Sequence, residues 1–335
     1  MHGNVLELAM DISRVTGEKI ASLEQIMLKT RMLAINARLE AARAGEAGLS
    51  FSVVAREMGT VADEVNAMSA ELSEAVHTNT ALIEQAGRNM MLQLRGNRLA
   101  DLARNAVEIM DRNLYERSCD VRWWATDSAV VDAVSAPAPD AARHASARLA
   151  TILRSYTVYL DLWIADASGQ IVCNGRPDRY PGLAGRDVSG ESWFIDGLKT
   201  ATGDDFAVCD IETNRALGGA KVAAYSTAIR MDGAERGRPV GVLGIFFDWQ
   251  PQATTIVTGV SLSEDERARS RVMLLDSRMR VIASSDGRTG DTYALQADAP
   301  WGHYVKDERL VAYGLTPGYE TYAGLGWYGC IDTPV

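Results

Sequence analysis

The stretch Thr30–Val54 reads TRMLAINARLEAARAGEAGLSFSVV, and it decides how the first third of the chain folds. Two glycines, Gly45 and Gly48, interrupt a run that otherwise favours helix, and such glycines end one helix and let the chain reverse direction. On both sides of them, apolar residues recur in alternating steps of three and four, the spacing of a coiled coil. The sequence therefore predicts a long antiparallel helical hairpin with its tip near Gly45.

Each arm of this hairpin carries its own apolar seam, along which we expect the two arms to pack. In the first arm the seam is Ile20, Leu23, Met27, Thr30, Ala34, Ala37 and Ala41, and in the second it is Phe51, Val54, Met58, Val61, Val65, Met68, Leu72 and Ala75. Small seam residues allow close approach of helices, as in a four-helix dimer, so a homodimer held by the coiled coil is expected. On spacing alone, a general coiled-coil oligomeriser explains the pattern equally well.

Composition and charge narrow the classes of function. The 335 residues carry 34 basic and 44 acidic side chains, a formal net charge of −10. An acidic chain without a basic block is a poor binder of nucleic acid or of an anionic membrane surface. No apolar run approaches the roughly 20 residues that cross a bilayer, and the first residues lack the pattern of a signal peptide. We expect no nucleic-acid partner, no membrane span and a cytoplasmic location.

The rest of the chain has a different composition. No proline occurs before residue 137, and all seven tryptophans lie at or after Trp123. Helix is expected to continue through residues 99–134 and again at 141–155. Strands are expected at 157–164, 170–174, 221–230 and 239–249, where β-branched and aromatic residues alternate with turns. A weak repeat joins Asp166-Ala-Ser-Gly-Gln to Asp276-Ser-Arg-Met-Arg at an offset of 110 residues (276 − 166). It indicates two tandem units of antiparallel sheet.

The hairpin tip resembles the signalling tip of methyl-accepting chemotaxis receptors. Leu33–Glu46 (LAINARLEAARAGE), followed by Gly48, Phe51 and Val53-Val54-Ala55, matches the family pattern LNAxIEAARAGExGxGFxVVAxEV, which binds the CheW coupling protein and the CheA kinase. The resemblance implies that Glu40 and Arg43 make polar contacts between receptor dimers, and that Asn36, Glu46 and Val53 meet the coupling protein and the kinase. The sequence departs from the family pattern at Leu28, Lys29, Arg31, Arg38 and Ser50.

The second part resembles the double Cache sensor domain of bacterial chemoreceptors. The segments DLWIADASGQIVCN, ESWFIDGL, KVAAYSTAI and GVLGIFFDW occur in the order of its first unit, and GYETYAGLGWYGCIDTP resembles the end of its second. The expected fold is α+β: a long antiparallel coiled-coil hairpin followed by two tandem PAS-like antiparallel sheets. The expected domains are 1–98, a chemoreceptor-like signalling hairpin, and 99–335, a double Cache-like ligand-binding domain.

The Cache resemblance also implies a ligand site in the first unit. The family pocket is framed by an Arg-x-Trp-Phe/Tyr motif, a strand tyrosine and an aspartate near the last strand. The corresponding residues are Glu191, Trp193, Phe194, Tyr225 and Asp248. Since a glutamate replaces the arginine, two acids beside aromatic rings favour a cationic amine. Two alternatives stay open: Arg186 or Lys221 restores carboxylate binding, or Trp193 and Phe194 are core residues and Asp248 is a strand-end cap.

These features predict a sensor and not an enzyme. No phosphate-binding loop, nucleophile elbow or zinc motif occurs, and neither a cofactor nor a metal is expected. We expect a soluble chemoreceptor-like transducer that senses a small molecule through its C-terminal Cache domain and signals through the hairpin tip to a CheA/CheW-type kinase complex. The first alternative is a coiled-coil scaffold or dimerisation protein whose Cache-like domain binds nothing. A further one is an enzyme regulator that binds partner helices.

Overall fold

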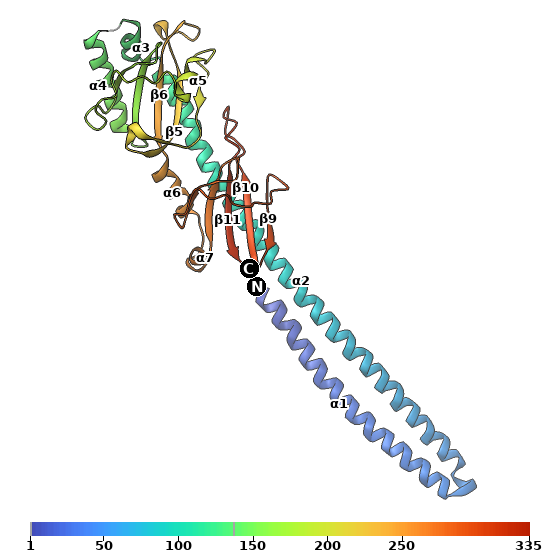
Figure 1. Cartoon of the computed structure of the whole chain (residues 1–335). Coiled ribbons are helices and arrows are strands. Elements are labelled where there is room, and N and C mark those ends of the chain that lie inside the picture. Colours follow the sequence, from blue (N-terminus) through green and yellow to red (C-terminus); the bar gives the residue numbers. More distant parts are fainter. Residues whose placement is uncertain (1, 137) are drawn as a thin grey trace. The chain divides into compact units, whose positions relative to one another are not determined.

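The computed structural model describes residues 2–136 and 138–335, which form two compact units, Met1–Arg95 and Gly96–Val335. The first unit is a helical hairpin (Figure 1). Helix α1 (His2–Arg43) leads into a short 3₁₀ turn η1 (Gly45–Gly48), and α2 (Leu49–Trp124) starts directly after it. Gly45 has φ +54°, which permits the reversal, and a side chain at Gly48 would meet the carbonyl oxygen of Ala41. The predicted hairpin and the position of its tip are confirmed.

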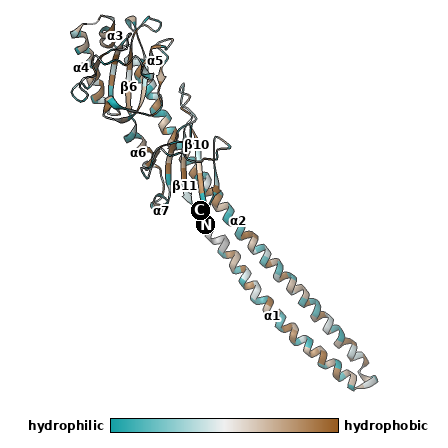
Figure 2. Ribbon diagram, in the orientation of Figure 1, coloured by the Kyte–Doolittle hydropathy of each residue, from teal (hydrophilic) through white to brown (hydrophobic). Residues whose placement is uncertain are grey.

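The seam between the two arms is built from small residues. In the first arm Ile20, Ala34 and Ala41 are buried, as predicted. In the second arm the prediction of the seam is wrong, because Gly48, Ala55, Ala62 and Ser69 are buried instead of the larger residues. The large apolar side chains of the predicted stripe face outward: Phe51, Val54, Met58, Val61, Met68 and Leu72 are all exposed. Hydrophobic residues accordingly recur along both helices of the hairpin (Figure 2).

The second unit contains the rest of α2 and two antiparallel sheets. The predicted continuous helix over 99–134 is wrong in one place, because α2 ends at Trp124 and α3 (Ser128–Ser135) begins after a break. The Asp127 side chain caps α3 by accepting a hydrogen bond from the Ala129 backbone N–H. Helix α4 (Pro139–Ser155) then leads into the first sheet. A capping aspartate offers the backbone an alternative to continued helix, which explains the break.

The first sheet has the strand order β2-β1-β6-β5-β3, with β4 also paired to β5. Helix α5 (Ser192–Leu198) lies against β5 and β6. The long strands β1, β5 and β6 dominate the core of this sheet, and their bounds agree with the predicted segments to within two residues. The elements are β1 (Tyr159–Asp166), β2 (Ile171–Asn174), β3 (Ala207–Val208), β4 (Glu212–Asn214), η2 (Arg215–Leu217), β5 (Ala220–Arg230), η3 (Met231–Gly233) and β6 (Pro239–Asp248).

The second sheet repeats this topology, with the order β8-β7-β11-β10-β9. Two helices precede it, and its elements are α6 (Trp249–Gly259), α7 (Glu264–Arg269), β7 (Arg271–Leu275), β8 (Val281–Ser284), β9 (Trp301–Lys306), β10 (Arg309–Leu315) and β11 (Tyr328–Pro334). The turns between the first two strands of each sheet match in detail. Asp166 Oδ1 accepts the backbone N–H groups of Ser168 and Gln170, and Asp276 Oδ1 accepts those of Arg278 and Arg280. The predicted tandem repeat of antiparallel sheets is confirmed.

Candidate functional site

The hairpin tip presents a mixed polar and apolar surface to solvent. All five residues predicted to bind partners, Asn36, Glu40, Arg43, Glu46 and Val53, are exposed. Glu40 and Arg43 form an ion pair one helical turn apart, with 2.7 Å between Oε1 and Nη1. Exposed pairs of this kind add little to stability, so their charges remain available to a partner. The tip is therefore a surface suited to association.

In the second unit, a cluster around α5 brings three of the predicted ligand residues together. Trp193 Nε1 donates a hydrogen bond of 2.7 Å to Glu191 Oε2, and Arg186 Nη2 lies 3.6 Å from Glu191 Oε1. The Trp193 ring packs edge-on against Phe194 and Phe246 and reaches β6 at Gly244, where any side chain would collide with it. Trp193 and Phe194 are buried in the core of the first sheet, while the Glu191 carboxylate stays partly exposed beside them.

Tyr225 lies on the other face of the same sheet. In the β5–β6 register Ala224 pairs with Phe246, which contacts Trp193, whereas Tyr225 pairs with Ile245. Because successive side chains of a strand point to opposite faces, Tyr225 cannot touch the cluster around Glu191. Its ring instead stacks near Phe206, and its hydroxyl donates to the Tyr322 hydroxyl at 3.4 Å. Burial raises the pKa of Tyr225, and the neighbouring Tyr322 adds to this.

Asp248 ends β6 on the face that carries Trp193. It holds the N-cap position of α6, but its side chain makes no capping hydrogen bond. The alternative interpretation of Asp248 as a side-chain cap therefore finds no support. Burial raises the pKa of its carboxyl, although the positive charge of Arg179 opposes the effect. A half-buried carboxylate without a capping role is a suitable partner for a cation.

One acidic residue that the sequence did not reveal, Glu212, lies near Glu191, and a second, Asp210, lies near Glu212. Burial raises the pKa of Glu212, and the negative charges of Glu191 and Asp210 raise it further. Asp210 also lies 3.7 Å from Arg280 of the second sheet. The run Asp210-Ile-Glu212 after Cys209 was the available signal, but only strand pairing places it beside α5. The arrangement concentrates negative charge around Glu191, where an ammonium group would find carboxylate partners.

Two further features bear on function. Within residues 2–136 and 138–335, no group of three or more histidine, cysteine, aspartate or glutamate side chains lies close enough together to hold a metal ion. Among the helices of this described part, none is both long enough and apolar enough to cross a membrane.

A known protein family matches the first unit and the start of the second. Residues 4–112 match the signalling domain of methyl-accepting chemotaxis proteins. The methyl-accepting chemotaxis protein McpA of Pseudomonas putida is 36% identical over 109 residues, which are 29% of this chain and 17% of that protein. Methyl-accepting chemotaxis protein I of Escherichia coli is 36% identical over 98 residues, 26% of this chain and 18% of that protein. The chain thus spans less than a fifth of the length of these curated relatives.

Solved structures superpose on the second unit. The sensory domain of the Campylobacter jejuni chemoreceptor Tlp3 superposes with a TM-score of 0.55 at 15% identity, covering 74% of this chain and 95% of that one. The ligand-binding domain of the Pseudomonas aeruginosa amino acid chemoreceptor PctC, solved with GABA, superposes with a TM-score of 0.52 at 16% identity, covering 72% and 99%. At such identities the likeness establishes the fold. Residues 4–112 therefore match the signalling domain of methyl-accepting chemotaxis proteins, a non-catalytic family, and the C-terminal domain has the double Cache fold.

Proposed function

We propose that this protein is a chemoreceptor-like transducer in the cytoplasm, which senses a small molecule at the first sheet and signals through the hairpin tip to a CheA/CheW-type kinase complex. In this proposal residues 1–98 signal and residues 99–335 sense. The observation that carries it is the exposed tip, whose five partner residues all face solvent. The helix α2 contributes to both units, so a ligand that favours one arrangement of α2 biases the tip.

Dimerisation is part of this proposal. The exposed apolar stripe of α2 repeats at heptad spacing, and α1 carries exposed Leu8, Ile12 and Val15 at similar spacing. The small residues of the inner seam already pack the two arms of one hairpin together. The exposed apolar stripes therefore need a second hairpin to bury them. We propose that two chains form a four-helix bundle in which the large apolar side chains make the shared core. Its expected signature is a dimer in sedimentation equilibrium that Met58→Glu with Val61→Glu converts to monomer.

The ligand we propose is a cationic amine held by Glu191 and Asp248, with Trp193 and Phe194 forming the apolar wall. The acidic surroundings of Glu191, with Glu212 and Asp210 nearby, support this choice. Tyr225 is also a predicted site residue, but its side chain lies on the other face of the sheet, so the proposed site does not include it. Arg186 already forms an ion pair with Glu191, so an amine must compete with Arg186 for this carboxylate.

A thermal-shift panel with three compounds of matched chain length tests the ligand class: pentylamine, 5-aminopentanoate and glutarate. Pentylamine is expected to raise the melting temperature most, and Glu191→Gln should weaken its binding about tenfold or more, because one charged partner is lost. Glu264→Gln, which changes an exposed acid on α7, is the matched control. Stabilisation by glutarate alone would assign the site to carboxylates through Arg186, and no shift with any compound would favour the scaffold alternative.

Binding of the tip to its partners requires a separate experiment. Wild-type protein is expected to co-sediment with CheA and CheW, and Glu46→Ala should reduce the bound fraction. Glu18→Ala, an exposed change on α1 far along the chain from the tip, serves as control. If wild type and Glu46→Ala are equally absent from the kinase pellet, this chain does not couple to such a kinase.

A further inference from the structure

A cavity lies on the face of the first sheet opposite the Glu191 cluster, beside the last turn of α2. It encloses about 340 Å³, within the range of small-molecule sites. Its walls come from the end of α2, from β5 and from the loops at 203–204 and 233–235. Thr227 of β5 lines it and shares a face with Tyr225, because both occupy odd positions along the strand. The cavity is thus distinct from the cluster around Glu191.

A buried arginine lines this cavity with one donor unused. Arg230, at the end of β5, is 5% exposed. Its Nη1 donates to the Gly237 carbonyl at 2.9 Å, and its Nη2 donates to the Thr200 carbonyl. Its Nε–H has no hydrogen-bond partner, and no carboxylate in the described part of the chain lies within ion-pairing distance of the guanidinium. Asp205, which lies in the field of Arg230, is already engaged by the Thr202 N–H and hydroxyl.

Such an arginine is costly unless something compensates it. A buried charge normally has a counter-ion, and a buried donor normally has an acceptor. The two carbonyls that Arg230 contacts satisfy part of its hydrogen-bonding capacity but carry no net charge. An anion in the cavity would supply the missing charge.

The mouth of the cavity suits an organic anion better than an inorganic one. Trp123, on the last turn of α2, is 70% exposed and lines the cavity. Arg122 beside it is held in place by hydrogen bonds to the carbonyls of Ser118 and Asp204 and lies over the Phe206 ring. The acidic side chains that line the cavity, Asp204 and Glu235, are exposed at its rim. Positive charge therefore lies in the interior, and an indole surface lies at the entrance.

We propose that this cavity is a second ligand site, which binds a small carboxylate with a planar apolar body. The carboxylate forms an ion pair with the Arg230 guanidinium, and the apolar body rests on the Trp123 ring. The site adjoins the last turn of α2, whereas the Glu191 site lies on the other face of the sheet.

Benzoate is the probe for this site, and benzamide, which has the same shape without the charge, is its matched control. The readout is the proton–nitrogen resonance of the Arg230 Nε–H, identified by its absence in Arg230→Lys. Benzoate is expected to shift this resonance and slow its exchange, whereas benzamide leaves it unchanged. Trp123→Ala should weaken benzoate binding about tenfold, and Glu191→Gln should leave it unaltered, which separates this site from the amine site.

Three outcomes would overturn the proposal. The first is an Arg230 resonance that does not respond to benzoate, and the second is an equal response to benzamide. The third is benzoate binding that survives unchanged in both Arg230→Lys and Trp123→Ala. Trp123→Ala is the safer variant for folding, because the indole is exposed, and it keeps the test decisive if Arg230→Lys disturbs the loops at Thr200 and Gly237.

Discussion

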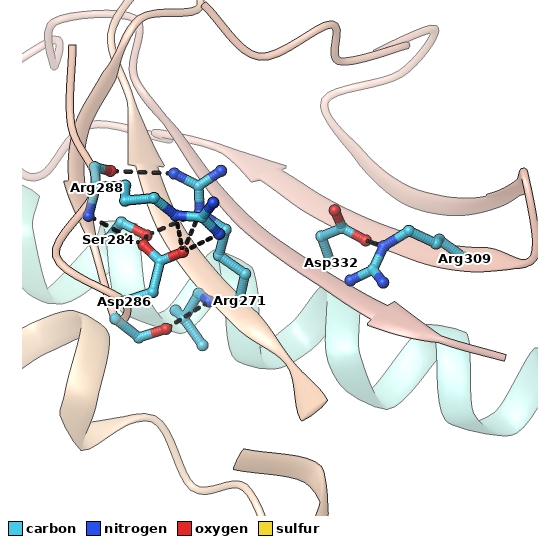
Figure 3. Close-up of polar contacts among 8 residues, drawn as sticks. Arg271, Ser284, Asp286, Arg288, Arg309 and Asp332 are labelled. Atoms are coloured by element: carbon cyan, nitrogen blue, oxygen red, sulfur yellow. Dashed lines mark hydrogen bonds and ion pairs between the residues drawn. The ribbon is translucent and has the colours of Figure 1, made fainter. Parts of the chain in front are cut away.

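The two sheets of the C-terminal unit carry the same polar link with opposite charges. In the first sheet, Asp161 of β1 accepts a hydrogen bond from Asn174, and Arg176 follows β2. At the offset of the sequence repeat, the second sheet has Arg271, Ser284 and Asp286, and Arg271 contacts both partners (Figure 3). The shared topology therefore requires a polar tie between the first strand and the segment after the second strand. It does not require a particular sign.

The inversion changes what each sheet buries. Asp161 is fully buried and stands opposite Phe246, so the first sheet keeps a carboxylate inside an aromatic core. Arg271 stands opposite Asp332 in the second sheet, and Asp332 pairs with Arg309 Nε at 2.5 Å. Each of these charged side chains therefore has an oppositely charged neighbour (Figure 3). The sheet proposed to bind ligands is the one whose buried carboxylate has hydrogen bonds but no ion pair. The other one has the features of a support.

The largest expected effect separates these two ties. Asp161→Ala should lower the free energy of unfolding by about 3 kcal/mol, because the Leu162 N–H, the Trp163 indole N–H and the Asn174 amide all lose their acceptor. Arg271→Ala should cost only about 1 kcal/mol, since Asp286 keeps its bonds from Ser284 and Arg288. Urea unfolding followed by tryptophan fluorescence reports both, because every tryptophan lies in the second unit. Equal losses would contradict the difference between the sheets.

An intermediate effect concerns the pH dependence of the second sheet. Burial alone would raise the pKa of Asp286, but hydrogen bonds from Ser284 and Arg288 and the charge of Arg271 hold it well below its usual range. A lowered pKa stabilises the fold above the unfolded value of about 3.9, and this stabilisation disappears as the pH falls toward the folded value. Asp286→Asn should therefore cost about 1 kcal/mol at pH 7 and progressively less below pH 4.

The control for this prediction is the double variant Arg271→Ala with Asp286→Asn. If the two groups act through each other, their separate costs will not add. Additive costs at pH 7, or a cost of Asp286→Asn that is constant down to pH 3, would show that the ion pair in Figure 3 contributes nothing measurable.

The success of the sequence predictions follows from how local each signal is. Four strands of the first sheet and the hairpin tip were predicted, because β-branched runs and paired glycines act over a few residues. The seam of the second arm was not, because a heptad pattern marks an apolar stripe without saying which helix covers it. Small residues such as Ala55 and Ala62 escape a search for large apolar side chains, yet they form the inner seam.

The same distinction between local and non-local signals explains which parts of the candidate site were predicted. The Glu191–Trp193 hydrogen bond joins neighbours in sequence, so the motif alone located it. The face on which Tyr225 lies depends on the register between β5 and β6, which no local pattern contains. Arg230 and its cavity were missed for a related reason. A buried arginine without a counter-ion becomes visible only when every neighbouring group has a known position.

The smallest expected effect is also the one of opposite sign. Burial raises the pKa of Asp161, although hydrogen bonds from Asn174, Leu162 and Trp163 oppose it. A carboxyl with a raised pKa binds its proton more tightly in the folded state, so its contribution to stability grows as the pH falls through the folded value toward about 3.9. The cost of Asp161→Ala should therefore increase on acidification, while that of Asp286→Asn decreases. Parallel unfolding curves from pH 7 to pH 3 measure both. If both costs change in the same direction, the opposite pKa shifts of Asp161 and Asp286 have no effect on stability. The two sheets would then differ only in their packing.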